Sequence, residues 1–169
     1  MIVDYDQHWP EMFAAERDRL ATALGVRAIR IEHNGSTSVP GLAAKPIIDI
    51  QIAVASLQPL APLVDALTPL GYVHVLHADD AFCPFLHRPA AWPHTHHVHL
   101  VEAGGLEERR TLAFRDYLRT HDHARRAYEQ LKRQLAALTD AGDPASREAY
   151  AVAKTDFIEA ILRRALPPA

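Results

Sequence analysis

The sequence has 169 residues, 49% of them apolar and 23% charged, and its formal net charge is −3 at pH 7. This composition is typical of a globular protein, and the length favours one domain over residues 1–169. The charge argues against a nucleic-acid or membrane footprint over the whole chain, no apolar run is long enough to span a bilayer, and one cysteine excludes an intramolecular disulfide or a cysteine-based zinc site within one chain.

Apolar spacing and turn residues divide the chain into a mixed first part and a helical second part. The predicted elements of the first part are, in chain order, a helix at 9–24, strands at 26–32 and 47–54, a helix at 59–70, and strands at 72–76, 82–87 and 94–102. Helices are predicted to follow at 106–120, 122–138 and 145–166. Because the strands precede the last helices, we expect an α+β domain in which helices cover a mixed β-sheet.

The segment 33–52 joins the first two predicted strands and places an aspartate inside an isoleucine-rich strand. Alternate strand residues point to opposite faces, so the isoleucines belong to the core while Asp49 and Gln51 face a cleft or solvent. Such an aspartate is a site residue or a costly structural feature, because buried carboxylates are rarely left unpaired. The structural alternative is that Asp49 caps a loop or pairs with Lys45.

The loop before this strand offers groups that bind anions. Gly35 permits close approach of the backbone, and Ser36 and Thr37 provide hydroxyl and amide groups. Lys45 adds a positive charge suited to phosphate. The loop and Asp49 together favour a binding site over a simple rigid turn.

A Gly-Ser turn followed by an aspartate in an apolar strand resembles the signature of the nucleotidyltransferase fold. The resemblance implies that the Gly-Ser pair holds the phosphates of a nucleoside triphosphate. It also implies that strand carboxylates bind Mg²⁺, which neutralises charge developing in phosphoryl transfer. The signature has two acidic residues separated by one apolar residue, whereas this chain has Asp49, Ile50 and Gln51. A neutral amide at the second position argues against catalysis by two metal ions.

Over essentially its full length the chain resembles the GrpB-like family, whose members are related to the nucleotidyltransferase fold. The resemblance rests on Tyr5, Trp9-Pro10 and Phe13, on G-S-T-S-V-P-G-L-A-A-K-P-I-I-D-I at 35–50, on T-H-H-V-H-L at 95–100, on A-F-R-D-Y-L-R at 113–119, and on Tyr128, Lys132, Tyr150, Lys154 and Phe157. It implies a nucleotidyltransferase-like mixed β-sheet with an N-terminal helix and a C-terminal helical layer. Kinship of fold does not by itself imply an activity.

Two histidines occupy alternate positions of the predicted strand at 94–102. If the apolar residues between them face the core, His97 and His99 face the same cleft as Asp49. This set can bind one transition metal, so Asp49, His97 and His99 are candidate metal ligands and catalytic residues. Alternatively, the histidines act as a general base, contact phosphate, or satisfy hydrogen bonds within the sheet. The remaining histidines of this region are interpreted as structural or surface residues, namely His87, His94 and His96.

Three basic residues lie on or beside the apolar stripes of the C-terminal helices, namely Arg115, Lys132 and Lys154. A charged side chain on such a stripe must pair, extend its charge to solvent, or line a cavity. If the three converge on a cleft with Asp49, they favour a ligand that carries phosphate.

We therefore expect a nucleotide or small phosphorylated ligand, bound with a divalent metal that is either Mg²⁺ or a transition metal. The candidate ligand-binding residues are Gly35, Ser36, Thr37, Lys45, Arg115, Lys132 and Lys154. The alternatives are a catalytically silent nucleotide- or metabolite-binding module, which Gln51 favours, and a metal-dependent hydrolase that uses the His/Asp site. The sequence carries no signal-peptide pattern, which favours a cytoplasmic location, and it leaves the oligomeric state open.

Overall fold

The computed structural model describes residues 2–138, 140 and 142–166. Its elements are, in chain order, α1 (Trp9–Leu24), β1 (Ala28–Asn34), β2 (Ile48–Val54), α2 (Ala61–Leu67), β3 (Val73–Val75), β4 (Phe85–Arg88), β5 (His96–Glu102), α3 (Leu106–Thr120), α4 (Asp122–Ala137), α5 (Pro144–Val152) and α6 (Thr155–Ala165). The strands form one sheet in the order β1-β2-β5-β4-β3, in which β2 and β5 are parallel and the other neighbours antiparallel. The expected α+β class with a mixed sheet is confirmed.

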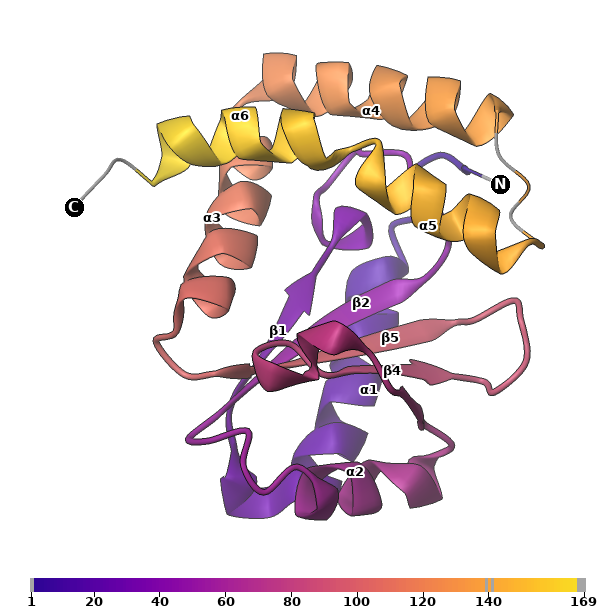
Figure 1. Cartoon of the computed structure of the whole chain (residues 1–169). Coiled ribbons are helices and arrows are strands. Elements are labelled where there is room, and N and C mark those ends of the chain that lie inside the picture. Colours follow the sequence, from indigo (N-terminus) through magenta and orange to yellow (C-terminus); the bar gives the residue numbers. More distant parts are fainter. Residues whose placement is uncertain (1, 139, 141, 167–169) are drawn as a thin grey trace.

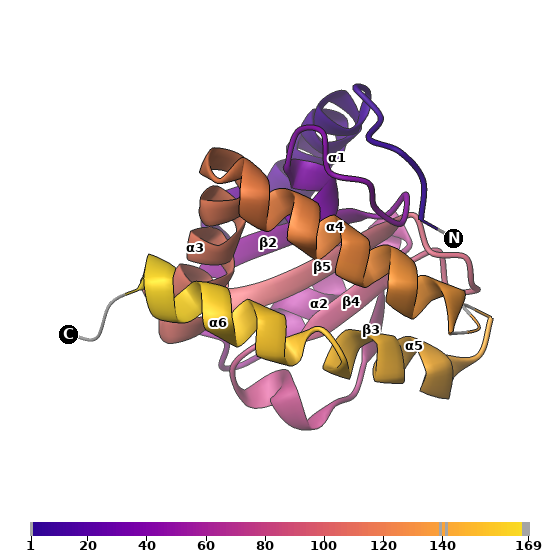
Figure 2. The same cartoon turned by 90° about the horizontal axis from the view of Figure 1, so that it is seen from above.

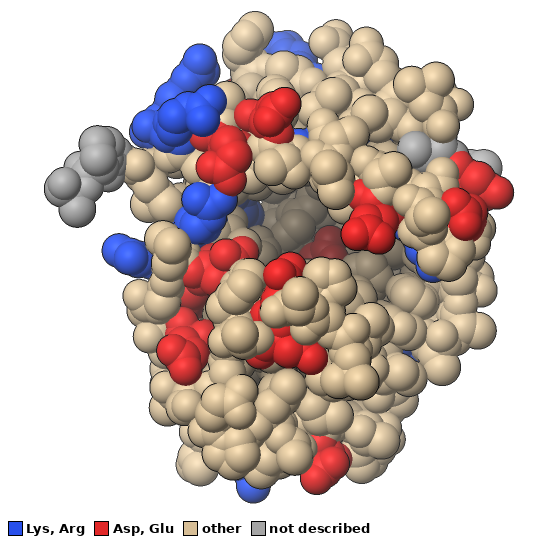
Figure 3. Space-filling view, in the orientation of Figure 1, with Lys and Arg blue, Asp and Glu red and all other residues tan. Residues whose placement is uncertain are grey.

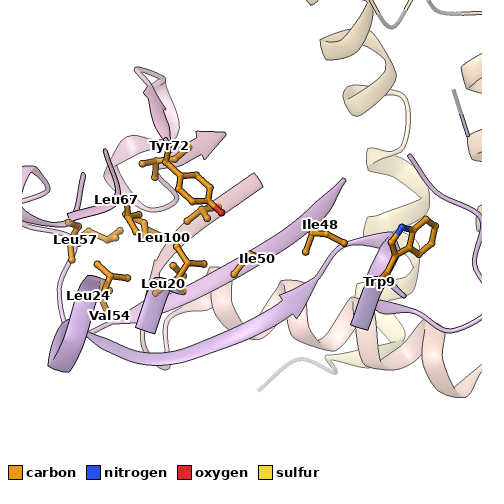
Figure 4. Close-up of a cluster of buried hydrophobic side chains, with 14 of the residues drawn as sticks. Trp9, Leu20, Leu24, Ile48, Ile50, Val54, Leu57, Leu67, Tyr72 and Leu100 are labelled. Atoms are coloured by element: carbon orange, nitrogen blue, oxygen red, sulfur yellow. The ribbon is translucent and has the colours of Figure 1, made fainter. Parts of the chain in front are cut away.

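Helices lie on both faces of this sheet (Figures 1 and 2). On one face, α1 and α2 pack over the isoleucines of β2 and bury a continuous apolar cluster (Figure 4). Its fully buried members include Leu20 and Leu24 of α1, Ile48 and Ile50 of β2, and Leu100 of β5. The alternation along β2 thus sends the isoleucines into the core and Asp49 to the other face.

The C-terminal helices α3 to α6 lie over that other face (Figure 1). They share a second apolar cluster with the loop that follows β1. Leu118 of α3, Tyr128 of α4 and Ile161 of α6 pack there against Val39 and Leu42 of the loop. This packing holds the loop between the sheet and the helical layer.

The parallel register of β2 and β5 determines which polar residues become neighbours. Asp49 lies opposite His97, and Gln51 lies opposite His99. The two pairs therefore occupy the same face of the sheet, beneath the C-terminal helices, as the alternation of each strand predicts.

The predicted single helix at 145–166 is wrong, because α5 and α6 are separated by a turn at Ala153 and Lys154. No glycine or proline marks this break. The turn allows α6 to pack against α3 while α5 lies over the sheet (Figure 2).

Strand boundaries also differ from those predicted. β1 begins two residues late because Gly25–Arg27 forms a 3₁₀ turn, and β4 begins at Phe85 because a 3₁₀ turn at Ala78–Ala81, capped by His77, precedes it. Within the described ranges, no helix is both long enough and apolar enough to cross a membrane.

Candidate functional site

A cavity of about 800 Å³ lies between the polar face of the sheet and the helical layer (Figure 3). We call it the lysine cavity, and its wall includes Ser36, Thr37, Lys45, Asp49, His87, Trp92, His94, His97, His99, Lys132, Arg147, Tyr150 and Lys154. Residues from the first and last parts of the chain therefore meet at one place. The cavity contains every predicted site residue except Gly35 and Arg115.

Asp49 is held at the floor of the cavity by its neighbours on two strands. Its carboxylate accepts from His97 Nδ1 at 3.2 Å, and the two side chains are 27% and 20% exposed, respectively. Burial alone would raise the pKa of Asp49. The hydrogen bond from His97 and the charges of His97, His99 and Lys154 outweigh burial and lower that pKa, so Asp49 is a carboxylate at neutral pH.

Gly35 makes room for this carboxylate. Its φ of 64° favours glycine, and a Cβ placed on it would lie 2.2 Å from Asp49 Oδ2. The predicted close approach at Gly35 is therefore an approach of the Asp49 side chain to the backbone. Gly35 shapes the site from just outside the cavity.

A chain of hydrogen bonds extends from Asp49 across the cavity wall. His97 Nε2 lies 3.1 Å from His94 Nδ1, and the His94 ring stacks on His87 with centroids 3.8 Å apart. Burial, together with His87 and His97, lowers the pKa of His94 to about 4, so this imidazole is neutral at pH 7. Asp49, His97 and His94 thus form an ordered donor–acceptor series, which is the arrangement used to orient an acid–base imidazole.

Three lysines line the cavity, and they are the only three lysines of the chain. Lys45 and Lys154 place their ammonium groups 4.2 Å and 4.4 Å from the Tyr150 ring centroid. Lys132 is 2% exposed and donates to the Ala43 carbonyl at 2.5 Å. Of the fifteen arginines of the chain, all of which the structure describes, Arg147 alone lines this cavity.

The positive charges of these lysines are not neutralised by direct ion pairs among the described residues. Burial lowers the pKa of Lys132 to about 7 and that of Lys154 to about 8, with neighbouring lysines adding to both shifts. In the described part of the chain, no ion pair joins any of these ammonium groups to a carboxylate. An anion in the cavity would therefore stabilise their charged forms.

The loop residues divide between structural and cavity-facing positions. Thr37 donates its hydroxyl to the Ile47 carbonyl and contacts His33 Nε2 at 3.1 Å, so its side chain fixes the loop. Ser36 lines the cavity and hydrogen-bonds to Tyr128. Burial raises the pKa of Tyr128, and this hydrogen bond opposes the rise.

Arg115 does not converge with the lysines. Its guanidinium donates to Glu32 at 2.8 Å, to Asp116 at 2.7 Å and to the His33 carbonyl at 3.0 Å. It lines another cavity, of about 280 Å³, whose wall also includes Gly35 and Ser36. The expected convergence of three helix cations with Asp49 is thus found for Lys132 and Lys154 and is wrong for Arg115.

The candidate metal ligands share the cavity without forming a cluster. Among the residues that the structure describes, no three His, Cys, Asp or Glu side chains are grouped closely enough to hold a metal ion. Asp49 contacts His97, whereas His99 Nδ1 lies 3.8 Å from Cys83 Sγ. Gln51, at the position of the second carboxylate, directs its oxygen to Thr111 and Asn34. Two metal ions do not fit this donor set, and metal binding through Asp49 stays a prediction.

Several residues of the wall are not among the predicted site residues. His94 and His87, which we predict to be structural or surface residues, also line the lysine cavity. Trp92 and Arg147 form a cation–π contact at 4.6 Å beside them. The run of histidines and aromatic residues at 92–99 is the sequence feature that could have indicated these positions. The direction of a side chain in the loop before a strand cannot be predicted, because a loop has no regular alternation of faces.

Comparisons with known proteins place this geometry in a family. A family model described as GrpB protein matches residues 1–164. The chain is 40% identical over 165 residues to a UPF0157 protein of Streptomyces coelicolor, covering 96% of this chain and 82% of the relative. The crystal structure of GrpB from Enterococcus faecalis aligns with a TM-score of 0.85 at 34% identity, covering 98% of this chain and 97% of that one.

A more distant similarity concerns the fold alone. The solved structure of the Cid1 poly(U) polymerase with MgGTP bound aligns with a TM-score of 0.55 at 15% identity, covering 85% of this chain and 46% of that one. The fold expected from the Gly-Ser turn and Asp49 is therefore confirmed as nucleotidyltransferase-like.

Proposed function

The chain belongs to the GrpB family, and on that premise we propose that it binds a nucleotide or another phosphorylated small molecule in the lysine cavity. The observation that carries the proposal is the convergence of all three lysines of the chain on the cavity that Asp49 also lines. A lysine supplies a point charge that suits phosphate oxygens. Because Lys132 is buried, Lys45 and Lys154 are half-buried, and no ion pair joins them to a carboxylate among the described residues, an anion would stabilise their charged forms.

The position of Lys154 supports the same ligand. Lys154 is the N-cap residue of α6 and makes no side-chain capping hydrogen bond. A cation at a helix N-terminus opposes the helix dipole and is a poor choice for stability. The same helix end favours an anion, so a phosphate beside Lys154 would interact favourably with both groups.

If the protein is an enzyme, we propose phosphoryl or nucleotidyl transfer. Asp49 would hold a divalent ion that neutralises phosphate charge, with the remaining ligands supplied by phosphate oxygens and water. His97 and His94 would position or accept a proton beside the phosphates, as their hydrogen-bonded order permits. A catalytically silent binding module is the second candidate, favoured by the buried neutral Gln51 where a second carboxylate belongs.

Thermal unfolding tests the proposal. Tm is measured with tripolyphosphate and with ATP, each in the absence and in the presence of Mg²⁺. Tripolyphosphate should raise Tm without metal, and Lys154→Met should weaken binding about tenfold or more, because a charge-assisted contact is lost. The matched control is Arg126→Met, which removes an exposed charge from α4 outside the cavity. Equal loss in both variants, or no shift with any phosphate compound, would contradict the proposal.

Asp49→Asn separates phosphate binding from metal binding. Without Mg²⁺ this variant should bind tripolyphosphate as well as the wild type or better, since one negative charge leaves the cavity. Any additional stabilisation that Mg²⁺ confers on the wild type should vanish in the variant. If the Mg²⁺ effect persists unchanged, Asp49 is not the metal ligand.

A further inference from the structure

A second cavity, of about 390 Å³, adjoins the lysine cavity. We call it the amide cavity, because Asn34 and Gln51 lie in its wall, together with Thr111 of α3. Both cavities include His99 and Phe85, so the two spaces meet at these side chains. A ligand that enters one can extend into the other.

Gln51 has a buried hydrogen-bond donor that no described residue accepts from. It is 1% exposed, and its oxygen accepts from the Thr111 hydroxyl at 2.5 Å and from the Asn34 amide at 3.3 Å. The nitrogen of this amide, Nε2, makes no hydrogen bond among the described residues. Such a buried donor destabilises the fold unless something accepts its hydrogens.

The charge of the amide cavity differs from that of the lysine cavity. Its wall contains no lysine or arginine among the described residues, and the charged groups that it does contain are Asp79 and Glu107. A phosphate would be repelled there. Phe82 and Phe85 add aromatic surface, which suits the face of a planar ring.

We propose that the amide cavity binds an uncharged, carbonyl-bearing ring of the ligand, a nucleobase such as uracil, while the lysine cavity binds its phosphates. This inference rests on the proposed function and names the substrate class as a nucleotide. The Gln51 amide donates to a ring carbonyl, and the aromatic side chains contact the ring. The opposite charges of the two cavities orient the ligand, because only its phosphate end is attracted to the lysines.

Four probes separate the two cavities by calorimetry: tripolyphosphate, uridine, UTP and ATP. UTP should bind at least tenfold more tightly than tripolyphosphate and more tightly than ATP, whose adenine has no carbonyl. Gln51→Glu and Gln51→Leu should each abolish the advantage of UTP. Gln51→Leu should leave the affinity for tripolyphosphate unchanged, whereas the negative charge added by Gln51→Glu should lower it. Gln130→Glu, on the exposed surface of α4, is the matched control and should bind all four probes normally.

Cys83 provides a second readout that does not depend on phosphate. It is the only cysteine of the chain and lines the amide cavity but not the lysine cavity. Uridine should slow its alkylation by N-ethylmaleimide severalfold, whereas tripolyphosphate should not. The Gln51 variants should lose this protection by uridine.

The outcomes distinguish the two proposals. Equal affinities for UTP, ATP and tripolyphosphate, with no protection of Cys83 by uridine, would overturn the amide-cavity assignment and leave the phosphate site standing. Protection by uridine without any binding of tripolyphosphate would overturn the phosphate site and support the ring site. An advantage of UTP that survives both Gln51 variants would also overturn the assignment.

Discussion

Gly35 and Asp49 constrain each other at the centre of the site. The carboxylate occupies the space that a Cβ at position 35 would take, and the Gly35 backbone adopts φ 64° and ψ −169°, a region open almost only to glycine. The turn is therefore built around the aspartate. At the residue scale, the glycine of the Gly-Ser turn is required sterically by Asp49, apart from any role of the turn in binding a ligand.

We expect Gly35→Ala to destabilise the protein by about 3 kcal/mol or more, from backbone strain of about 1–3 kcal/mol and the clash with Asp49. Urea unfolding measures the change. Gly104→Ala is the matched control, since Gly104 has φ 75° and nothing within 4 Å of an added Cβ, so it reports strain alone. Equal effects in the two variants would show that Asp49 does not occupy the space beside Gly35.

At the scale of the element, α5 is a short part of the cavity wall. It has nine residues and reaches the rest of the fold through Tyr150, which lies beneath Lys45 and Lys154, and through Arg147, which contacts Trp92. Its N-terminus is fixed by Asp143, which accepts from the Ser146 backbone N–H at 2.8 Å. A short helix of this kind depends strongly on its cap.

Asp143→Ala should destabilise α5 by about 1 kcal/mol and lower the affinity for tripolyphosphate, because the helix that carries Tyr150 opens more often. Hydrogen exchange of the α5 amides provides the measurement. Asp143→Ser keeps a capping oxygen and should retain near-normal protection. Faster exchange throughout the sheet, in place of α5 alone, would argue against a local effect.

At the scale of the whole molecule, buried histidines make the fold sensitive to acid. Burial lowers the pKa of His33 to about 4, and likewise those of His94 and His96 to about 4. His33 is stacked on Phe13 at 4.7 Å, so its ring is part of the packing between α1 and β1. The folded state thus binds fewer protons than the unfolded chain between pH 6.5 and 4, and the free energy of unfolding falls as pH falls through this window.

We expect Tm to drop by about 10 °C or more between pH 7 and pH 5, with His33 contributing a large share. Thermal unfolding at closely spaced pH values measures it. The pH dependence of Tm should be weaker in His33→Gln. It should be unchanged in His121→Gln, which alters an exposed histidine. A Tm that is constant over this range would contradict the assignment of neutral buried imidazoles.

The sequence by itself determined the α+β class, the alternation that sends Asp49, His97 and His99 to one face, and the Gly-Ser turn that indicates the fold. These features follow from local periods, two residues for a strand and about 3.6 for a helix, and from steric needs of single residues. The cavity-facing position of Lys132 agrees with its place at the edge of an apolar helix stripe, whereas Lys154 lies in the turn before α6.

Only the tertiary structure decided which of these side chains meet. Arg115 pairs with Glu32 of β1 and with its neighbour Asp116, while Lys132 and Lys154 line the lysine cavity, and the break between α5 and α6 has no local signal. The unpaired nitrogen of Gln51 and the link from His97 to His94 likewise depend on packing between distant segments. Local patterns specify the face of an element, but contacts across the fold depend on how whole elements pack, which no short period encodes.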